Sequence, residues 1–390
     1  MYATQRSSPA SALPASRATV TPPPLPTTRH FDQEVPMSQD LGHLSRRGLL
    51  FGGAAIGAGT LLTACTSNEK GDDGSGDSQT VAGNSNSEPS KPVKIGFSVP
   101  AGDHGWILAV TTNGKAQAAK FSEVTFVPVE SGGNDPAVQR AAVESLIQQK
   151  VDAIVFLPHE GDKLEPTALK AMEAGIPIIN LDREFTNPFA YRTLIKGDNY
   201  GMGVAAGNFI AAELKKAGKT APVIAEIGGI DFLPLTKDRS RGFKDALARN
   251  GLKVNHQVWA DFTVAKGQSV TANLLQSAPK IDAIWNHDDD QGLGALAAMK
   301  QANRSEFILV GGAGSRNAMD TIKKGDTPLK ATVTYSPTMA SSAVAIARLV
   351  AQGRGMGDLA ELQVPKTIVL ASETVTKENV EAYLPLGFAS

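Results

Sequence analysis

From position 93 onward, short apolar runs alternate with stretches of helical spacing, and this alternation limits the possible folds more than any other feature. The runs at 93–99, 124–129 and 151–157 are almost continuously apolar, and the stretch at 107–120 has helical spacing. Strands of this kind are typical of sheets that helices cover on both faces. Consecutive strand–helix units require parallel pairing with right-handed crossovers. The pattern therefore predicts an α/β protein with a parallel sheet.

A second series of the same kind begins after Asp198-Asn199. Its predicted strands are 222–227, 253–259, 281–285, 307–310 and 330–335. A long helix is expected over 338–352, and a last short strand over 367–370. Two such series in succession predict two doubly wound, Rossmann-like lobes with a cleft between them.

The first 92 residues have a different character. Residues 1–36 are rich in Pro, Ser, Thr and Ala and are expected to be disordered, and either Met1 or Met37 could be the start. Residues 66–92 consist mostly of Ser, Asn, Gly, Asp and Pro, which is typical of a flexible, solvated tether.

Between these two segments, Arg46-Arg47 precedes the apolar run 49–62, which is shorter than the roughly 18 residues of a spanning helix. The sequence Leu62-Thr63-Ala64-Cys65 follows. This arrangement resembles a twin-arginine export signal that ends in the lipobox of bacterial lipoproteins. The resemblance implies that residues 1–65 are an extension plus signal, and that lipidated Cys65 anchors an exported protein to the outer face of the cell membrane. The alternative is a short buried helix with an ordinary core cysteine.

The bulk composition excludes several functions. Lys and Arg total 38 and Asp and Glu total 39, so no global charge attracts nucleic acid or anionic lipid. The single cysteine excludes an intrachain disulfide and cysteine-based metal clusters. The six histidines show no metal-ligand spacing, and the phosphate-loop, zinc-protease and nucleophile-elbow motifs are absent. We therefore expect no metal, no cofactor and no enzymatic activity.

Two further motifs have both a functional and a structural interpretation. The glycine run at 201–207 is similar to a dinucleotide-binding loop. However, it follows no apolar strand directly, and its third glycine is not at the spacing that this loop requires. Close packing between helices is therefore the favoured interpretation. Asp288-Asp289-Asp290 beside His287 could hold a cation. Consecutive aspartates point in different directions, however, so a loop at a strand end is favoured.

The apolar run 176–181 ends in Asp182 and Arg183, where a strand should pass into a loop. Ligands of parallel sheets bind at the carboxyl ends of the strands. A carboxylate beside a guanidinium suits a polyhydroxylated ligand, because each hydroxyl both donates and accepts a hydrogen bond. The alternative is a surface ion pair or a strand-end cap.

From position 93 to near the C-terminus, the chain resembles the periplasmic sugar-binding proteins of the ribose/galactose type, the substrate-binding components of ABC importers. The resemblance is carried by Ile179-Asn180-Leu181-Asp182-Arg183, Gly197-Asp198-Asn199, Arg239-Ser240-Arg241-Gly242-Phe243, Ala260-Asp261-Phe262 and Leu293-Gly294-Ala295-Leu296. It implies two lobes that close over a ligand and are joined by three crossings of the chain, expected near Gly197, Tyr335 and Leu362. The N-terminal lobe would then hold 93–197 and 336–362, and the C-terminal lobe 198–335 and 363–390.

The resemblance also implies the ligand contacts. Asp182 and Arg183 match the pair that grips sugar hydroxyls. The loop of Asp103, His104 and Trp106 corresponds to an aromatic pair, in which Trp106 stacks on the sugar ring. Phe262 matches the stacking aromatic of the second lobe. The family's second arginine falls in the segment 237–239, where either Lys237 or Arg239 is the contact.

Three positions depart from the ribose type. Asp288 stands in place of an asparagine, Ala313 in place of a sugar-binding aspartate, and Tyr335 in place of a hinge glutamine that reaches the ligand. An unpaired buried polar group costs about 1–3 kcal/mol. The loss of an acceptor at Ala313 therefore predicts a monosaccharide or related polyhydroxylated ligand other than ribose.

These features together predict capture of a ligand without chemistry. The expected protein is a monomeric lipoprotein that binds a sugar and delivers it to an ABC permease, a partner implied by the resemblance alone. The alternative is a sensor that presents a sugar or an autoinducer-2-like quorum signal to a membrane receptor. A sugar-responsive transcription regulator is excluded, because the N-terminal region holds an export signal and a tether where a helix-turn-helix would be needed.

Overall fold

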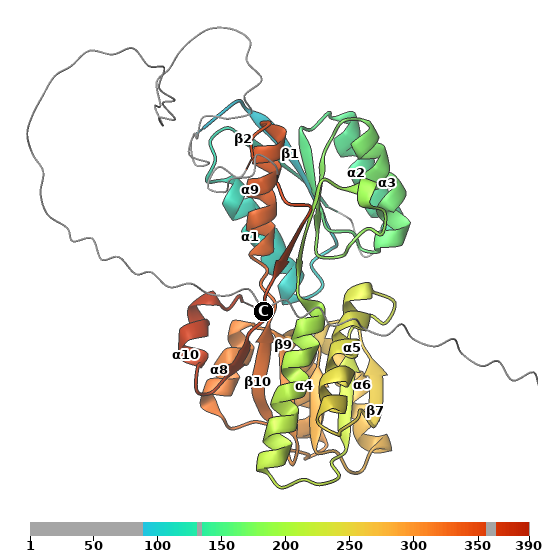
Figure 1. Ribbon diagram of the computed structural model, residues 1–390, viewed down its shortest axis with the longest axis vertical. Helices are drawn as coiled ribbons and strands as arrows, with labels where there is room; N and C mark the ends of the chain where they lie inside the picture. The colour runs from blue at the N-terminus through green and yellow to red at the C-terminus, as the bar shows by residue number, and fades with distance from the viewer. Residues whose placement is uncertain (1–88, 131–134, 356–363, 390) are drawn as a thin grey trace, which may run out of the picture. The chain divides into compact units, whose positions relative to one another are not determined.

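The predicted alternation of strands and helices is present in the computed structural model, which describes residues 89–130, 135–355 and 364–389 (Figure 1). All of these residues belong to one compact unit. The predicted export signal, Cys65, most of the tether and the segment around Leu362 lie outside the described residues. No helix in the described part of the chain has the length and apolarity needed to cross a membrane.

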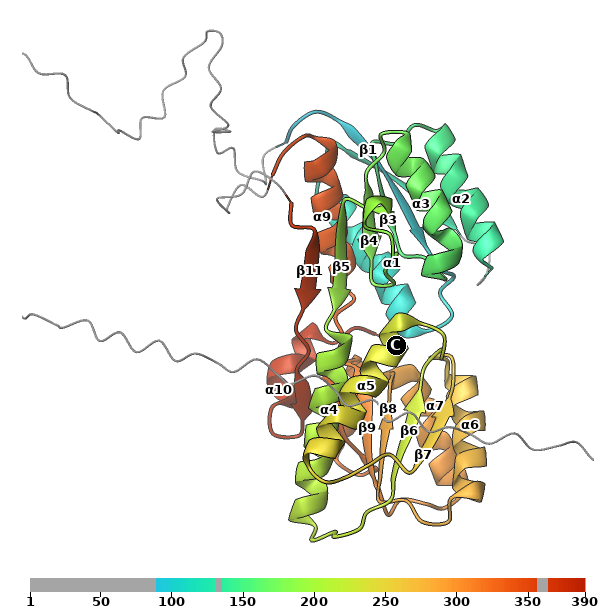
Figure 2. The same cartoon turned by 45° about the vertical axis from the view of Figure 1, so that its right-hand side comes forward.

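The first lobe is built on a six-stranded parallel sheet with the order β11-β5-β4-β3-β1-β2. Its strands are β1 (Val93–Val99), β2 (Val124–Glu130), β3 (Ala153–Phe156), β4 (Ile178–Leu181), β5 (Thr193–Gly197) and β11 (Thr367–Leu370). Its helices are α1 (Gly105–Ala118), α2 (Pro136–Gln148), α3 (Gly161–Glu173) and α9 (Met339–Ala351). Figures 1 and 2 show α1 and α9 on one face of this sheet and α2 and α3 on the other.

The alternation of side chains along a central strand explains this two-sided cover. Ala153 and Val155 of β3 are buried in the cluster that includes α1 and α9, whereas Ile154 and Phe156 are buried in the cluster that includes α2 and α3. Successive strand residues point to opposite faces, so a strand with helices on both sides must be apolar throughout. This is why the continuous apolar runs predict the fold.

The second lobe has its own six-stranded sheet with the order β12-β10-β9-β8-β6-β7. Its strands are β6 (Ile224–Gly228), β7 (His256–Trp259), β8 (Ala283–Asn286), β9 (Ile308–Ala313), β10 (Leu329–Thr334) and β12 (Thr374–Thr376), of which only β12 is antiparallel to its neighbour. Its helices are α4 (Asn199–Lys216), α5 (Pro234–Arg249), α6 (Val264–Ser277), α7 (Asp289–Gln301), α8 (Arg316–Lys324) and α10 (Val380–Tyr383). The helices α4 and α5 share one core cluster, and α6 and α7 share another on the opposite face.

Three segments connect the two lobes: β5 to α4, β10 to α9, and β11 to β12. The last of these differs from the prediction. Residues 363–390 were expected to lie wholly in the second lobe, but β11 pairs in parallel with β5, so residues 367–370 belong to the first sheet (Figure 2). The strand β5, which has no counterpart among the predicted strands, would otherwise leave its backbone groups unpaired at the sheet edge. A four-residue strand carries no signal that says which of two sheets it joins.

The glycine run at 201–207 lies within α4, where it packs against α5. A Cβ atom at Gly203 would lie 2.0 Å from the carbonyl oxygen of Arg239, and one at Gly207 would lie 2.7 Å from the Cβ of Ala246. These distances leave no room for a side chain. The interpretation of the run as a close helix contact is therefore confirmed.

We expect Gly203→Ala to lower the free energy of unfolding by about 1–3 kcal/mol, since the added methyl overpacks the contact between α4 and α5. The loss should appear even though alanine favours a helix by about 1 kcal/mol over glycine. Chemical denaturation measures the effect, with Asn208→Ala at an exposed position of the same helix as the control. Unchanged or increased stability in Gly203→Ala would show that the two helices are not in close contact.

Candidate ligand-binding site

A small cavity lies between the two lobes. Its lining residues are His104, Trp106, Asp182 and Arg183 from the first lobe, Leu235, Arg239, Phe262, Asp288 and Ala313 from the second, and Tyr335 from the connection between β10 and α9. The open space is about 20 Å³, which is room for about one water molecule. A ligand larger than water therefore requires the lobes or their side chains to move apart before it enters.

Three of the lining residues are held in a backbone conformation that residues with a Cβ atom avoid. The φ angle is +62° at Asp182, after β4, +73° at Phe262, after β7, and +96° at Ala313, at the end of β9. Each such residue costs on the order of 1–3 kcal/mol and persists only where the surrounding structure enforces it. All three lie at the carboxyl ends of parallel strands, the place where ligands of such sheets bind.

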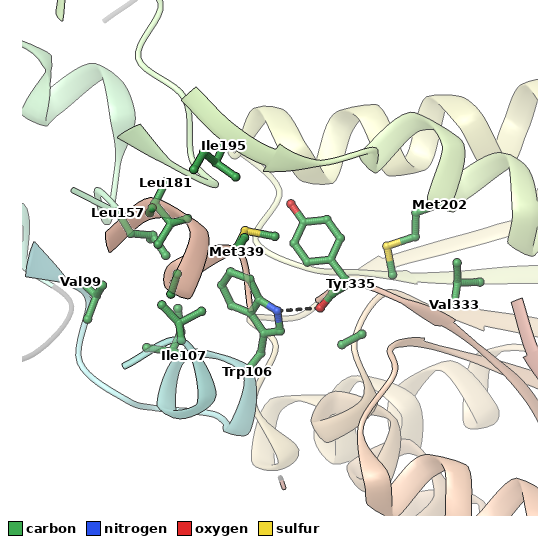
Figure 3. Packing of buried hydrophobic residues seen from close by; sticks show 14 of the residues in the cluster. Val99, Trp106, Ile107, Leu157, Leu181, Ile195, Met202, Val333, Tyr335 and Met339 are labelled. Atoms are coloured by element: carbon green, nitrogen blue, oxygen red, sulfur yellow. Dashed lines mark hydrogen bonds between the residues drawn. The ribbon is translucent and has the colours of Figure 1, made fainter. Parts of the chain in front are cut away.

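Tyr335 joins the two lobes at this cavity. Its hydroxyl donates a hydrogen bond to Asp182 Oδ1 and accepts one from Asn199 Nδ2 at 3.1 Å. The indole nitrogen of Trp106 donates to the Tyr335 carbonyl oxygen at 2.9 Å (Figure 3). Burial and the charge of Asp182 raise the pKa of Tyr335. The phenol therefore keeps its proton and acts as the donor to Asp182.

Trp106 and Tyr335 belong to an apolar cluster that extends from one lobe to the other. Trp106 and Met339 of the first lobe and Met202 of the second surround Tyr335 (Figure 3). The rings of Trp106 and Tyr335 have centroids 5.6 Å apart. The hydrogen bond between Tyr335 and Asp182 thus lies in a water-poor environment, where it is stronger than at the surface.

Two arginines line the cavity, and Arg239 is the one from the second lobe. Its Nε donates to Asn199 Oδ1 at 2.9 Å, and one terminal nitrogen donates to the His287 carbonyl oxygen at 3.1 Å. Its guanidinium carbon lies 4.6 Å from the centre of the Tyr335 ring and 5.9 Å from that of Phe262. Arg239 therefore orders the aromatic walls as well as supplying charge.

Arg183 has a donor that is left without a partner. One terminal nitrogen donates to the His159 carbonyl oxygen at 2.8 Å, but Nε is buried and makes no hydrogen bond among the described residues. A buried polar group without a partner costs about 1–3 kcal/mol. Arg183 lines the cavity, so a ligand acceptor that reached Nε would recover this energy.

The carboxylates and histidine of the cavity have shifted pKa values. Burial raises the pKa of Asp182, against the Tyr335 hydrogen bond and the charge of Arg183. Burial raises the pKa of Asp288 to about 6, with the opposing attraction of His104 too weak to cancel it. For His104, burial alone would lower the pKa, but the hydrogen bond with Asp103 and the charge of Asp288 outweigh it and raise the pKa. Perturbed groups that share a cleft are typical of functional sites.

Two of the predicted contacts do not line the cavity. Lys237 is exposed, whereas Arg239 is buried and lines the cavity. Residues two apart on a helix point about 200° apart, so only one of the two can face inward, and that residue is Arg239. Asp103 is exposed, and its carboxylate is 2.5 Å from His104 Nδ1, in a hydrogen bond that connects it to the site.

The three aspartates at 288–290 have separate partners. Asp288 caps α7 through the amides of Asp290 and Gln291, and it also lines the cavity. Asp289 accepts hydrogen bonds from the Ser315 amide and the Thr332 hydroxyl. The described residues contain no group of three or more His, Cys, Asp or Glu side chains that could hold a metal ion.

Comparison with known proteins shows which family has this architecture. A family model described as a periplasmic binding protein domain matches residues 95–355. The ribose import binding protein of Bacillus subtilis is 32% identical over 255 residues, which cover 65% of this chain and 80% of the relative. A xylitol-binding protein of Mycolicibacterium smegmatis is 27% identical over 339 residues, which cover 86% and 87%. A crystal structure from Mycobacterium smegmatis in complex with β-D-fucofuranose is 28% identical, with a TM-score of 0.68, and covers 75% of this chain and 94% of that chain.

Two parallel-sheet lobes with a polar and aromatic cavity between them define a two-lobed ligand-binding protein. With a family match that spans most of the described residues, the chain belongs to the periplasmic binding protein family. Its relatives bind substrates rather than transform them, and the chain is a binding protein, not an enzyme.

We expect Tyr335→Phe to lower the unfolding free energy of the ligand-free protein by about 1–3 kcal/mol, because the buried carboxylate of Asp182 loses a donor and Asn199 loses an acceptor. Thermal or chemical denaturation measures the change. Tyr200→Phe is the matched control, since the Tyr200 hydroxyl donates to Asp245 at the surface and its removal should cost less than about 0.5 kcal/mol. Equal effects of the two substitutions would contradict the importance of the hinge tyrosine.

Proposed function

We propose that the protein captures a monosaccharide or a related polyhydroxylated small molecule between its two lobes and delivers it to an ABC-type importer. The observation that carries this proposal is the composition of the cavity wall, which combines charged side chains with aromatic rings: Asp182, Arg183, Arg239 and Asp288 with Trp106, Phe262 and Tyr335. A sugar presents hydroxyls around its edge and C–H groups on its faces. Charged donors and acceptors at the edge, with aromatic walls over the faces, match both.

The proposed capture depends on movement of the lobes. In the arrangement described, the Tyr335 hydroxyl occupies one oxygen of Asp182, and the cavity is too small for a sugar. A ligand hydroxyl would replace or share this hydrogen bond after the lobes separate. Because residues of both lobes line the cavity, a ligand gains its full set of contacts only when the lobes close again, and binding therefore favours the closed form.

The named relatives support a small polyhydroxylated ligand. Their names or titles specify ribose, xylitol and β-D-fucofuranose. These molecules share hydroxyls on adjacent carbons, but they differ in ring and chain form. We propose a ligand of this class other than ribose, because Ala313 offers no side-chain acceptor and Tyr335 fills space beside Asp182.

We also propose how the protein is placed in the cell. The twin-arginine segment and the lipobox at 62–65 support export and anchoring through lipidated Cys65, with residues 66–92 as the tether. The ABC permease as partner follows from the family of the relatives. We expect a monomer, since the ligand cavity is complete within one chain.

A panel of pentoses, hexoses, deoxysugars and polyols should include at least one compound that raises the melting temperature of the protein. A ligand at 100 times its Kd adds about 2.7 kcal/mol of stability. In Asp182→Asn, the affinity for that compound should fall about tenfold or more, because a charged hydrogen bond contributes about 1.5–3 kcal/mol. Lys237→Ala, at the exposed position, is the control and should bind normally. No stabilisation by any sugar or polyol would contradict the proposed ligand class, and normal binding by Asp182→Asn would contradict the proposed site.

We expect the affinity for that ligand to fall as the pH is lowered through about 6, since the pKa of Asp288 is raised to about 6 and its protonated form loses a charged acceptor. Above this pH, Asp288 is ionised and the affinity should level off. Titration calorimetry from pH 5 to pH 8 tests the profile. Asp288→Asn should bind more weakly at pH 8 and should lose most of the dependence. A wild-type profile in this variant would assign the titration to another group, such as His104.

A further inference from the structure

We propose that Asp290 is a positioning residue, which holds the ligand-facing loop of the first lobe against the second lobe without lining the cavity itself. This proposal rests on the proposed function, because it concerns how the same cavity closes. Asp290 lies in the first turn of α7, and its side chain is nearly fully buried, at 5% exposure. No residue contact implied by the resemblance assigns it a role.

The start of α1 lacks a cap of its own. Its N-cap residue, His104, makes no side-chain hydrogen bond to the helix, and the first turn of α1 contains no acidic residue. The first amides of any helix have no partner within the helix and need an acceptor from elsewhere. For a helix start this deeply buried, an unmet amide would be costly.

Asp290 provides that acceptor from the other lobe. The backbone N–H of Gly105 donates to Asp290 Oδ2, across a sequence separation of 185 residues. The same carboxylate lies at the N-terminal end of α7. Helix N-termini carry partial positive charge, so one carboxylate is stabilised by two helices, one from each lobe.

This hydrogen bond acts on the residues that face the ligand. Gly105 lies between His104 and Trp106, and both of these line the cavity. The ring of His104 is 5.8 Å from that of Phe262 in the opposite lobe. A fixed Gly105 amide therefore fixes the positions of the His104 and Trp106 side chains at the cavity.

The contact is made to a backbone amide, and no part of it depends on the pattern of ligand hydroxyls. It exists only while the two lobes are together. Its contribution should therefore be the same for every ligand, whereas a residue that touches the ligand should favour some ligands over others.

Two substitutions remove the bond from opposite sides. Asp290→Ala removes the acceptor. Gly105→Pro removes the donor, and proline is tolerated at the first position of a helix. The preceding residue, His104, has φ −149° and ψ 165°, which is the extended conformation that a following proline requires. Asp320→Ala, on an exposed face of α8, is the matched control for the loss of one carboxylate from the second lobe.

The first measurement is hydrogen exchange in the ligand-free full-length chain. We expect Asp290→Ala to speed exchange in peptides covering the start of α1, in the lobe that does not contain the substitution, while Asp320→Ala leaves them unchanged. This result needs no ligand, so it remains decisive if the proposed ligand class is wrong. Unchanged exchange at the start of α1, in a variant whose melting transition shows that it is folded, would overturn the proposal.

The second measurement is affinity for two or more compounds that the panel identifies. Asp290→Ala and Gly105→Pro should each weaken the binding of all of them by the same factor, up to about tenfold, because the closed form loses one charge-assisted hydrogen bond. The double variant should be no weaker than either single variant, because both remove one interaction. Additive losses would overturn the proposal, as would a change in the preference between compounds, which would make Asp290 a ligand contact.

Discussion

The buried hydrogen bond from Tyr335 to Asp182 lies at the centre of a network that connects the first lobe, the second lobe and one of the segments between them. Asp182 belongs to the first lobe, Tyr335 to a connection between the lobes, and Asn199, which donates to the same hydroxyl, to the start of α4 in the second lobe. Arg239 then extends the network into the second lobe through Asn199. Because all four groups are buried, a substitution at one of them changes the hydrogen bonds that the others can make.

The two sheets explain why these groups meet. In each lobe the central strands are parallel, so their carboxyl ends lie along one edge, and the segments that follow carry the polar residues. The positive φ angles of Asp182, Phe262 and Ala313 occur at or just after these strand ends. Such strain is retained where the surrounding packing enforces it. Ala313 packs in the apolar cluster that includes Trp106 and Tyr335, and Phe262 packs in a smaller cluster with Leu233 and Leu235.

Much of the fold could be predicted because the central strands are apolar on both faces, a pattern that few other structures produce. The strand β5 was not predicted, and β11 was predicted as a strand but assigned to the wrong lobe, because both strands are short and have weaker patterns. In the site, Asp182 was predictable as a polar residue that directly follows a strand, whereas Phe262 was predicted from the family resemblance of Ala260-Asp261-Phe262. The sequence left open whether Lys237 or Arg239 faces the cavity. The helix α5 begins at Pro234, and from this start Arg239 lines the cavity while Lys237 is exposed.

The sequence nevertheless contained a signal that Arg239, rather than Lys237, faces inward. Proline is common at the first position of a helix, and a start at Pro234 places Leu235, Arg239 and Phe243 on one face at intervals of four. The contact between Asp290 and Gly105 had no such signal. It joins two lobes through a backbone amide, and no periodicity or motif specifies it.

A crystal structure of the protein with a compound selected by the sugar panel is the most direct test of this account. The account predicts a ligand between the lobes, with its C–H face against Trp106 or Phe262 and its hydroxyls bound to Asp182 and Arg183. The Tyr335 hydroxyl should then have given up or shared its place on Asp182. A ligand bound elsewhere, for example in the apolar groove lined by α1 and β2, with the cavity unchanged, would contradict it.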